Sequence, residues 1–99
     1  MSGSSTAFRQ LCEALLALGN MRTAERFLED LCTPAELAAL AERWRVCRLL
    51  WSEKYSYREI YTLTGVSTAT VTRVARCLWD PSGGGYRTIL EKMKKKEKQ

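Results

Sequence analysis

The residues best suited to bind another molecule lie in one stretch, Ser56–Leu78, which reads SYREIYTLTGVSTATVTRVARCL. Within it, Val71, Val74 and Leu78 recur at the spacing of one helical face. If these three turn inward, a second set of side chains lies on the opposite face. That set is Ala69, Thr72, Arg73 and Arg76. Small residues permit close approach, threonine donates or accepts hydrogen bonds, and arginine pairs with guanine or phosphate, so this face predicts contact with duplex DNA.

Two short helices must position this face, and local signals mark where each begins and ends. Ser56 and Glu59 have the spacing of a capping box, which predicts a helix start. Gly65 can adopt the positive φ that ends the helix sharply, and Ser67 is a good N-cap for the next one. The pattern predicts a helix-turn-helix over residues 56–79.

The inner face of the second helix is expected to pack against the first. We expect Val71, Val74, Ala75 and Leu78 to contact apolar residues of the first helix and the turn. Those residues are Ile60, Leu63 and Val66. A buried helical hairpin with an ordinary solvated face is the alternative interpretation, because short helix pairs with a glycine turn also serve that purpose.

Chain length and charge set limits on the class of protein. The 99 residues suffice for one small domain with a marginal core, so help from a second chain is expected. The 16 Lys and Arg against 11 Asp and Glu give a net charge of +5, which favours polyanionic partners. Part of the excess lies in the final KMKKKEKQ, a run typical of a solvated tail.

The four cysteines do not form a metal motif. They are evenly spread without a C-x-x-C pair, and the chain has no histidine, so we expect no metal site. Cys12, Cys32 and Cys47 lie within apolar patterns and are expected to be small buried hydrophobes in a reducing compartment. No signal peptide or membrane span is indicated, so a cytoplasmic protein with no membrane partner is expected.

The rest of the chain has helical periodicity throughout. Apolar residues at i, i+3, i+4 and i+7 predict helices over about 5–18, 22–32 and 34–53, with a Thr33/Glu36 capping box before the third. The glycines after Pro81 predict a turn, and a short helix is expected from Tyr86. The predicted class is therefore all-α with six helices: a flexible N-terminus at 1–5, one domain at 6–93 and a basic tail at 94–99.

Trp44 and Trp51 indicate contacts beyond a single neighbouring helix. They lie seven residues apart on a helix that is apolar over much of its circumference. We therefore expect a homodimer, since small helical DNA readers usually need two half-sites. A monomeric core that buries both rings is the alternative.

Several motifs resemble the Trp repressor family in order and spacing. They are Leu31–Glu36 (LCTPAE), Arg43, Ser56-x-Arg58-Glu59, Gly65 and Ala69–Arg73 (ATVTR). The wider pattern, with FLEDLCT at Phe27–Thr33 and STATVTRVARCL at Ser67–Leu78, is most similar to the Trp-repressor-like proteins of the YerC/YecD type. The resemblance implies a six-helix intertwined homodimer that presents two helix-turn-helix units to a palindromic operator.

The resemblance also implies which residues face DNA. The positions that match the family's DNA-facing residues are Tyr57, Arg58, Tyr61, Thr68, Ala69, Thr70 and Thr72. Tyr61 replaces a lysine that is common at that position in the family. We add Ser67, Arg73 and Arg76 to the predicted DNA-facing set.

An effector site follows from the same correspondence. In the Trp repressor the corepressor indole lies between two arginines, which match Arg43 and Arg73, and Thr33 matches a threonine beside the pocket. Val74 replaces a glycine and Cys77 a serine, and fitting a ligand against the added methyl groups costs about 1–3 kcal/mol. We therefore expect no tryptophan cofactor, and the effector is left unidentified. Ion pairing of the two arginines with Glu36, Glu42 or phosphate is an equal alternative.

These observations favour a sequence-specific, double-stranded DNA-binding transcriptional regulator, with repression expected. The alternative is a helical adaptor that docks a partner protein through the same face. An enzyme is disfavoured, because the chain lacks histidine, a G-x-S-x-G elbow, a paired-carboxylate motif and a Gly-rich cofactor fingerprint.

Overall fold

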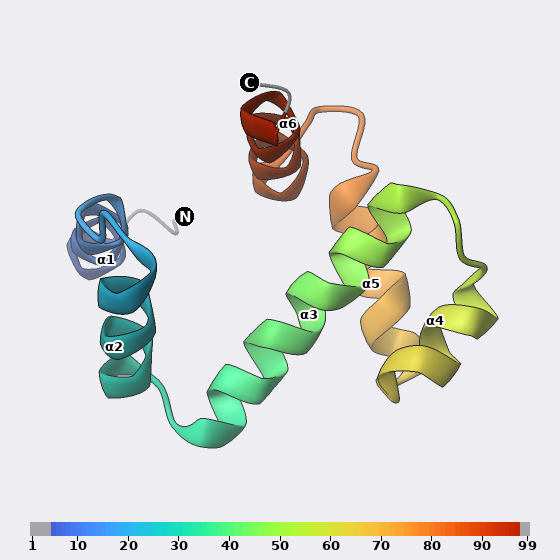
Figure 1. The fold of residues 1–99 in the computed structure, drawn as a ribbon, viewed down its shortest axis with the longest axis horizontal. Helices are drawn as coiled ribbons and strands as arrows, with labels where there is room; N and C mark the ends of the chain where they lie inside the picture. The colour runs from blue at the N-terminus through green and yellow to red at the C-terminus, as the bar shows by residue number, and fades with distance from the viewer. Residues whose placement is uncertain (1–4, 98–99) are drawn as a thin grey trace. The chain divides into compact units, whose positions relative to one another are not determined.

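The structure, a computed structural model, describes residues 5–97, and this part of the chain is helical without strands. Figure 1 shows its helices in chain order. They are α1 (Thr6–Leu16), α2 (Met21–Leu31), α3 (Pro34–Ser52), α4 (Tyr57–Thr64), α5 (Thr68–Leu78) and α6 (Gly85–Glu97). The predicted all-α class with six helices is confirmed, and the predicted bounds of the first three helices agree within two residues. The N-terminal residues 1–4, expected to be flexible, lie outside the described residues.

Side-chain caps fix where the helices begin. Ser5 Oγ accepts a hydrogen bond from the Phe8 N–H at 3.1 Å, and Asn20 Oδ1 accepts one from the Thr23 N–H at 2.9 Å. The predicted capping box before α3 is confirmed: Thr33 Oγ1 accepts from the Glu36 N–H at 3.1 Å, and Glu36 Oε1 accepts from the Thr33 N–H at 2.8 Å. Each cap satisfies backbone donors that the first helical turn leaves without partners.

The last helix runs further than a short one. A short helix was expected from Tyr86 with a basic tail at 94–99; α6 spans Gly85–Glu97 and includes Lys94–Lys96, and the basic tail at 94–99 stays a prediction. No proline or glycine follows Gly85 to stop the helix, and lysine is a good helix former that also interacts favourably with the negative helix C-terminus. Residues 98–99 lie outside the described part.

The chain divides into two compact units, Met1–Leu37 and Ala38–Gln99. The first unit contains α1 and α2, and no residue of either helix is buried. The second unit contains the buried core, which α3, α4, α5 and α6 all supply. Its members are Val46, Cys47, Leu50, Ile60, Val71, Val74, Ala75, Leu78 and Leu90. The single domain expected at 6–93 stays a prediction.

The core confirms most of the expected contacts of the helix-turn-helix. Ile60 and Val71 are fully buried, and Val66 packs against the core while half-buried. Leu63 is the exception: its side chain is 48% exposed, so the expectation that it packs inward is wrong. Leu63 lies three residues after Ile60, and α4 has only 8 residues, so the helix buries a single narrow stripe around Ile60.

The two tryptophans of α3 meet aromatic neighbours within the second unit. The ring centroids of Trp44 and Tyr86 lie 6.2 Å apart, and Trp51 stacks on Trp79 with centroids 5.9 Å apart and an interplanar angle of 22°. Both α3 tryptophans are half-buried, so this chain covers part of each ring and leaves part exposed.

None of the helices in residues 5–97 combines the length and the hydropathy that crossing a membrane would require.

Candidate nucleic-acid interface

The first helix of the interface, α4, starts at the predicted capping box. Ser56 Oγ accepts a hydrogen bond from the Glu59 N–H at 3.1 Å, and Glu59 Oε1 accepts one from the Ser56 N–H at 2.8 Å. Both bonds are local, so the helix start is fixed by the sequence itself. This reciprocal pair defines the direction in which the first turn of α4 leaves the preceding loop.

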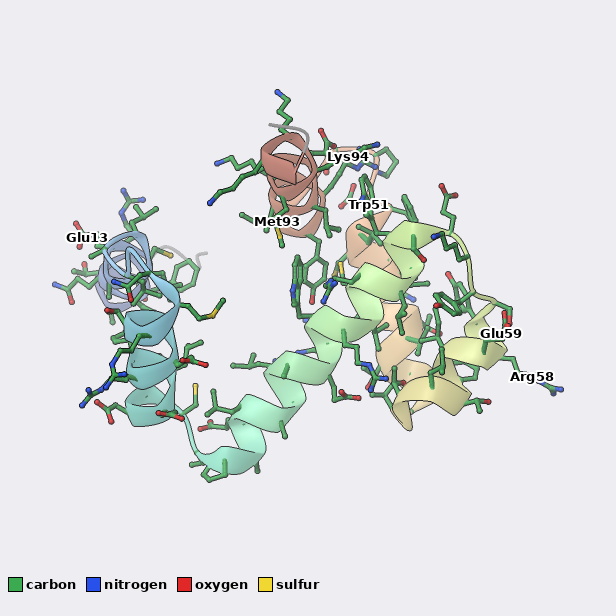
Figure 2. All side chains as sticks on the ribbon, in the orientation of Figure 1. Glu13, Trp51, Arg58, Glu59, Met93 and Lys94 are labelled. Atoms are coloured by element: carbon green, nitrogen blue, oxygen red, sulfur yellow. The ribbon has the colours of Figure 1, made fainter. Side chains whose placement is uncertain are left out.

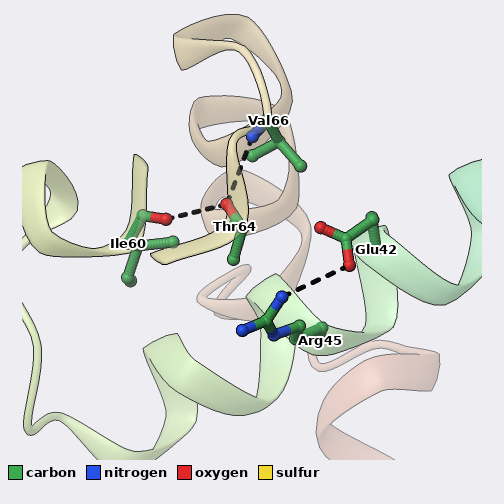
Figure 3. A network of polar contacts seen from close by, with 5 residues as sticks. All are labelled: Glu42, Arg45, Ile60, Thr64 and Val66. Atoms are coloured by element: carbon green, nitrogen blue, oxygen red, sulfur yellow. Dashed lines mark hydrogen bonds and ion pairs between the residues drawn. The ribbon is translucent and has the colours of Figure 1, made fainter. Parts of the chain in front are cut away.

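The turn after α4 is held by its backbone and by one threonine. Gly65 has φ +74° and donates its N–H to the Tyr61 carbonyl at 2.9 Å. Thr64 Oγ1 donates to the Ile60 carbonyl at 2.7 Å and accepts from the Val66 N–H at 3.3 Å (Figure 3). The side chain of Thr64 therefore connects the end of α4 to the residue that leads into α5. This fixes the angle between the two helices of the motif.

The second helix, α5, is capped by Ser67 and anchored by its inner face. Ser67 Oγ accepts from the Thr70 N–H at 3.1 Å and lies 3.0 Å from Thr70 Oγ1. The predicted inner face is buried: Val71, Val74 and Leu78 are fully enclosed and Ala75 is 5% exposed. Packed cores of this kind have little freedom to shift, so the outer face of α5 is held in a fixed orientation.

The outer face of α5 is exposed, as predicted. All four residues placed there from the sequence, Ala69, Thr72, Arg73 and Arg76, are exposed, and so are Ser67 and Thr68. Thr70 is half-buried, and its hydroxyl lies against Ser67, so it contributes to the cap more than to the outer surface.

The α4 positions lie beside this face with mixed exposure. Tyr57 and Arg58 are exposed, and Figure 2 shows Arg58 extending away from the ribbon. Tyr61 is half-buried and packs against the core, so only part of its ring can contact another molecule. The structure therefore brings eight of the ten predicted DNA-facing residues to the surface and leaves Tyr61 and Thr70 partly covered.

The second unit, which carries α5, has an excess of positive charge. The α5 helix contains two arginines and no acidic residue. Residues 38–99 hold 13 Lys and Arg against 6 Asp and Glu, a net charge of +7, whereas residues 1–37 hold 3 against 5, a net charge of −2. Within residues 5–96, neither Arg73 nor Arg76 forms an ion pair with a carboxylate. A phosphate could therefore approach either guanidinium without displacing a protein partner.

The predicted effector residues belong to different units, and the effector site stays a prediction. Thr33 belongs to the first unit and is occupied as the cap of α3, while Arg43 is half-buried and Arg73 is exposed in the second unit. The ion pairs considered for Arg43 are not found among the described residues. Glu42 instead pairs with Arg45 at 3.6 Å, one helical turn further along α3 (Figure 3).

The two positions that depart from the family pattern lie differently in the structure. Val74 is fully buried in the core, so its side chain fills space beneath α5. Cys77 is exposed on the same helix. The prediction that tryptophan is excluded stays a prediction.

The cysteines are free, and one has a perturbed pKa. Cys47 is buried as expected, whereas Cys12 and Cys32 are only half-buried. Burial raises the pKa of the Cys47 thiol from its ordinary 9.0 to about 11, and the neighbouring Cys77 adds to this increase. Cys47 is therefore a neutral thiol at physiological pH and lacks the thiolate that nucleophilic chemistry requires.

One surface feature was not found from the sequence. A hollow lies between the end of α3 and α6, with Trp51 in its wall and Arg48, Lys54 and Lys94 around it. Its only sequence signal is that Arg48 and Trp51 lie three residues apart, on one side of α3. Residues that are 40 positions apart along the chain complete it, so spacing alone cannot reveal it.

Comparison with known proteins gives one family. Residues 6–94 match the family model described as Trp repressor protein. A Bacillus subtilis (strain 168) protein, "Uncharacterized protein YerC", is 41% identical over 88 residues, which cover 89% of this chain and 83% of that protein.

Two solved structures share the fold. The first is a TrpR-like protein from Eubacterium eligens ATCC 27750, with 37% identity and a TM-score of 0.80 over 92% of each chain. The second is a proposed Trp repressor from Staphylococcus aureus, with 36% identity and a TM-score of 0.79 over 91% of this chain and 88% of that one.

Proposed function

Because the chain belongs to the Trp repressor family, a family of DNA-binding regulators, we propose that it is a sequence-specific repressor that binds duplex DNA through α4 and α5. One observation carries this proposal: the outer face of α5 is exposed, cationic and lined with threonine, while its inner face is fully buried. A rigid helix with small and hydrogen-bonding residues on its outer side fits the width of the major groove.

The proposed contacts divide into two kinds. Thr72 and Arg76 lie on the outer side of α5 and are assigned to base edges, with Arg73 available to either bases or phosphate. The start of α5, with its unsatisfied N–H groups and positive dipole end, is assigned to phosphate. The full proposed set is Tyr57, Arg58, Tyr61, Ser67, Thr68, Ala69, Thr70, Thr72, Arg73 and Arg76.

We also propose that the chain binds DNA as a homodimer. The first unit supports this, because α1 and α2 have no buried residue and expose large apolar side chains. Phe8 is 55% exposed, Leu16 87% and Met21 76%. A second copy would cover such faces and present a second α5, so the operator would be palindromic with half-sites roughly 34 Å apart.

Arg43 and Arg73, with Thr33, are retained as candidate effector residues that resemble the family's corepressor site. The proposal includes no requirement for tryptophan, because Val74 already fills space beneath α5.

A protein-interaction adaptor is the second candidate. The observation that favours it is the exposed Leu63 and Tyr57 on α4, 48% and 45% exposed, which add apolar area beside the cationic face. Salt dependence separates the two functions. DNA binding should weaken with a log–log slope near −0.9 per phosphate neutralised, whereas an apolar protein interface should respond little to salt.

The test is selection of bound duplexes from a random pool by the full chain, with and without tryptophan. The proposal predicts an enriched palindrome, equal enrichment in both arms and steep salt dependence. Failure to enrich any sequence would contradict it, and enrichment only with tryptophan would contradict the part that concerns the effector.

A further inference from the structure

The outer face of α5 has an uncharged part near its start and a charged part further along. Ala69 and Thr72 are exposed and carry no charge, whereas Arg73 and Arg76 follow them toward the end of the helix. An alanine side chain offers a phosphate neither a charge nor a hydrogen-bond donor. The N-terminal residues of a recognition helix are also those that contact base edges. The uncharged part is therefore suited to bases rather than to the DNA backbone.

The hydroxyl group of Thr72 is not used within the helix-turn-helix. Threonine in a helix can donate its hydroxyl to the carbonyl four residues earlier. Thr62 does so at 3.1 Å, and Thr64 does so at 2.7 Å (Figure 3). The Thr70 hydroxyl is also engaged, 3.0 Å from Ser67 Oγ. Across residues 5–97, no hydrogen bond to another residue engages the Thr72 hydroxyl, so this side chain has both its hydroxyl and its methyl group available.

The methyl groups of Ala69 and Thr72 are neighbours on one side of α5. Positions three apart on a helix have Cβ atoms about 5–6 Å apart, and they are separated by about 4.5 Å along the axis. This separation is close to one base-pair step of about 3.4 Å. The inner residues Val71 and Val74 are fully enclosed, so α5 has little freedom to rotate and the two methyl groups stay outward.

Thymine is the one unmodified base that presents a methyl group in the major groove. We propose that α5 recognises a thymine in each operator half-site by packing Ala69 Cβ and Thr72 Cγ2 against its 5-methyl group. The Thr72 hydroxyl, which can donate or accept, bonds to the edge of the same base pair. This inference rests on the proposed function, and the face concerned stays open in the proposed homodimer because DNA has to reach it there.

A uracil scan isolates the methyl group, because uracil keeps every other group that thymine presents in the major groove. The probe is a duplex that the full chain has enriched from a random pool. Each thymine is replaced in turn by deoxyuridine in both half-sites, and Kd is measured by fluorescence anisotropy. We expect one position at which binding weakens roughly fourfold per half-site, as loss of one buried methyl group predicts.

Matched variants assign the methyl contact to α5. Thr72→Ser removes the methyl group and keeps the hydroxyl, and Ala69→Gly removes the neighbouring methyl group. In both variants the ratio of Kd between the uracil and thymine duplexes should fall to below about twofold per half-site. Thr62→Ser makes the same change on an exposed threonine of α4 outside the proposed contacts, and the ratio should stay at the wild-type value. Each ratio compares two duplexes on one variant, so a change in folding stability cancels.

The outcomes separate this inference from the proposed function. A chain that binds no duplex would contradict both. A chain that binds its selected duplex, but equally well with thymine and with uracil at every position, would keep the proposed function and overturn this inference. A selected half-site without thymine would do the same. An unchanged ratio in both Thr72→Ser and Ala69→Gly would assign the thymine methyl group to other residues and would also overturn it.

Discussion

The two units of this chain are built from similar helices but stabilised in different ways. In residues 38–99, four helices contribute to one core in which six side chains are essentially inaccessible to solvent. In residues 1–37, α1 and α2 each have a side-chain N-cap, Ser5 and Asn20, yet neither helix buries a residue. The units also differ in charge, with a net −2 in the first and +7 in the second.

This difference shows what local signals can and cannot do. A cap satisfies a few backbone donors and sets where a helix begins, but a helix of 11 residues is marginal in water without tertiary contacts. The second unit carries its own core. We propose that a second copy covers Phe8, Leu16 and Met21 of the first unit, so that the first unit serves assembly and the second serves DNA contact.

The largest expected effect is in the core of the second unit. Ile60→Ala should lower the free energy of unfolding by about 3 kcal/mol, because it removes a fully buried side chain and leaves a cavity. Urea denaturation followed by circular dichroism measures this, with Leu63→Ala, three residues along α4, as the control that should change little. If Ile60→Ala and Leu63→Ala lowered the free energy of unfolding equally, the claim that α4 buries Ile60 and exposes Leu63 would be contradicted.

The next effect concerns assembly through the first unit. Leu16→Ser should weaken the dimer by about 2 kcal/mol, since a leucine covered by a second copy loses its burial. Leu63→Ser makes the same change on an exposed leucine of the second unit and should leave the dimer unchanged. Sedimentation equilibrium measures the dimer dissociation constant of both variants. If the wild-type chain is monomeric at all concentrations measured, the assignment of the first unit to assembly is wrong.

The free energy of unfolding should depend on pH because of Cys47. The unfolded thiol ionises near pKa 9.0, whereas the folded thiol ionises near 11, so between these pH values the unfolded state binds fewer protons and stability falls as pH rises. The decrease should be at most about 1.4 kcal/mol per pH unit. Denaturation series at pH 8 to about 10.5 should show a shallower decline for Cys47→Ala than for the wild type. Parallel declines would mean that Cys47 does not contribute.

A smaller effect is expected at the turn of the helix-turn-helix. Gly65→Ala should cost about 1 kcal/mol, because φ +74° is unfavourable for a residue with a Cβ, although the added atom would meet nothing within 4 Å. Gly85→Ala is the matched control: its added Cβ also meets nothing within 4 Å, and Gly85 is the first residue of α6 without a positive φ. Gly85→Ala should be neutral or slightly stabilising, and equal destabilisation of both variants would contradict the role of the turn.

The structural features that could be predicted from the sequence are those that depend on residues close together along the chain. The capping boxes at Thr33 and Ser56, the positive φ of Gly65 and the outward face of α5 all depend on residues within one or two helical turns of one another, and each is confirmed. The wrong prediction is the inward packing of Leu63, whose burial depends on how much of a short helix the core can cover.

Features that depend on distant residues could not be predicted in the same way. The hollow beside Trp51 is completed by Lys94, which lies more than 40 residues further along the chain. The roles of the DNA-facing and effector residues stay predictions, because exposure alone does not show what a surface binds.

The measurement that tests the proposed DNA contact most directly is competition binding with Arg76→Ala and Arg9→Ala on a selected duplex and on an unrelated one. Both variants remove one exposed arginine, the first from α5 and the second from α1. We predict that Arg76→Ala weakens binding to the selected duplex by about 1–3 kcal/mol and binding to the unrelated duplex much less, while Arg9→Ala changes neither. Equal losses in the two variants, on both duplexes, would contradict the claim that α5 reads DNA sequence.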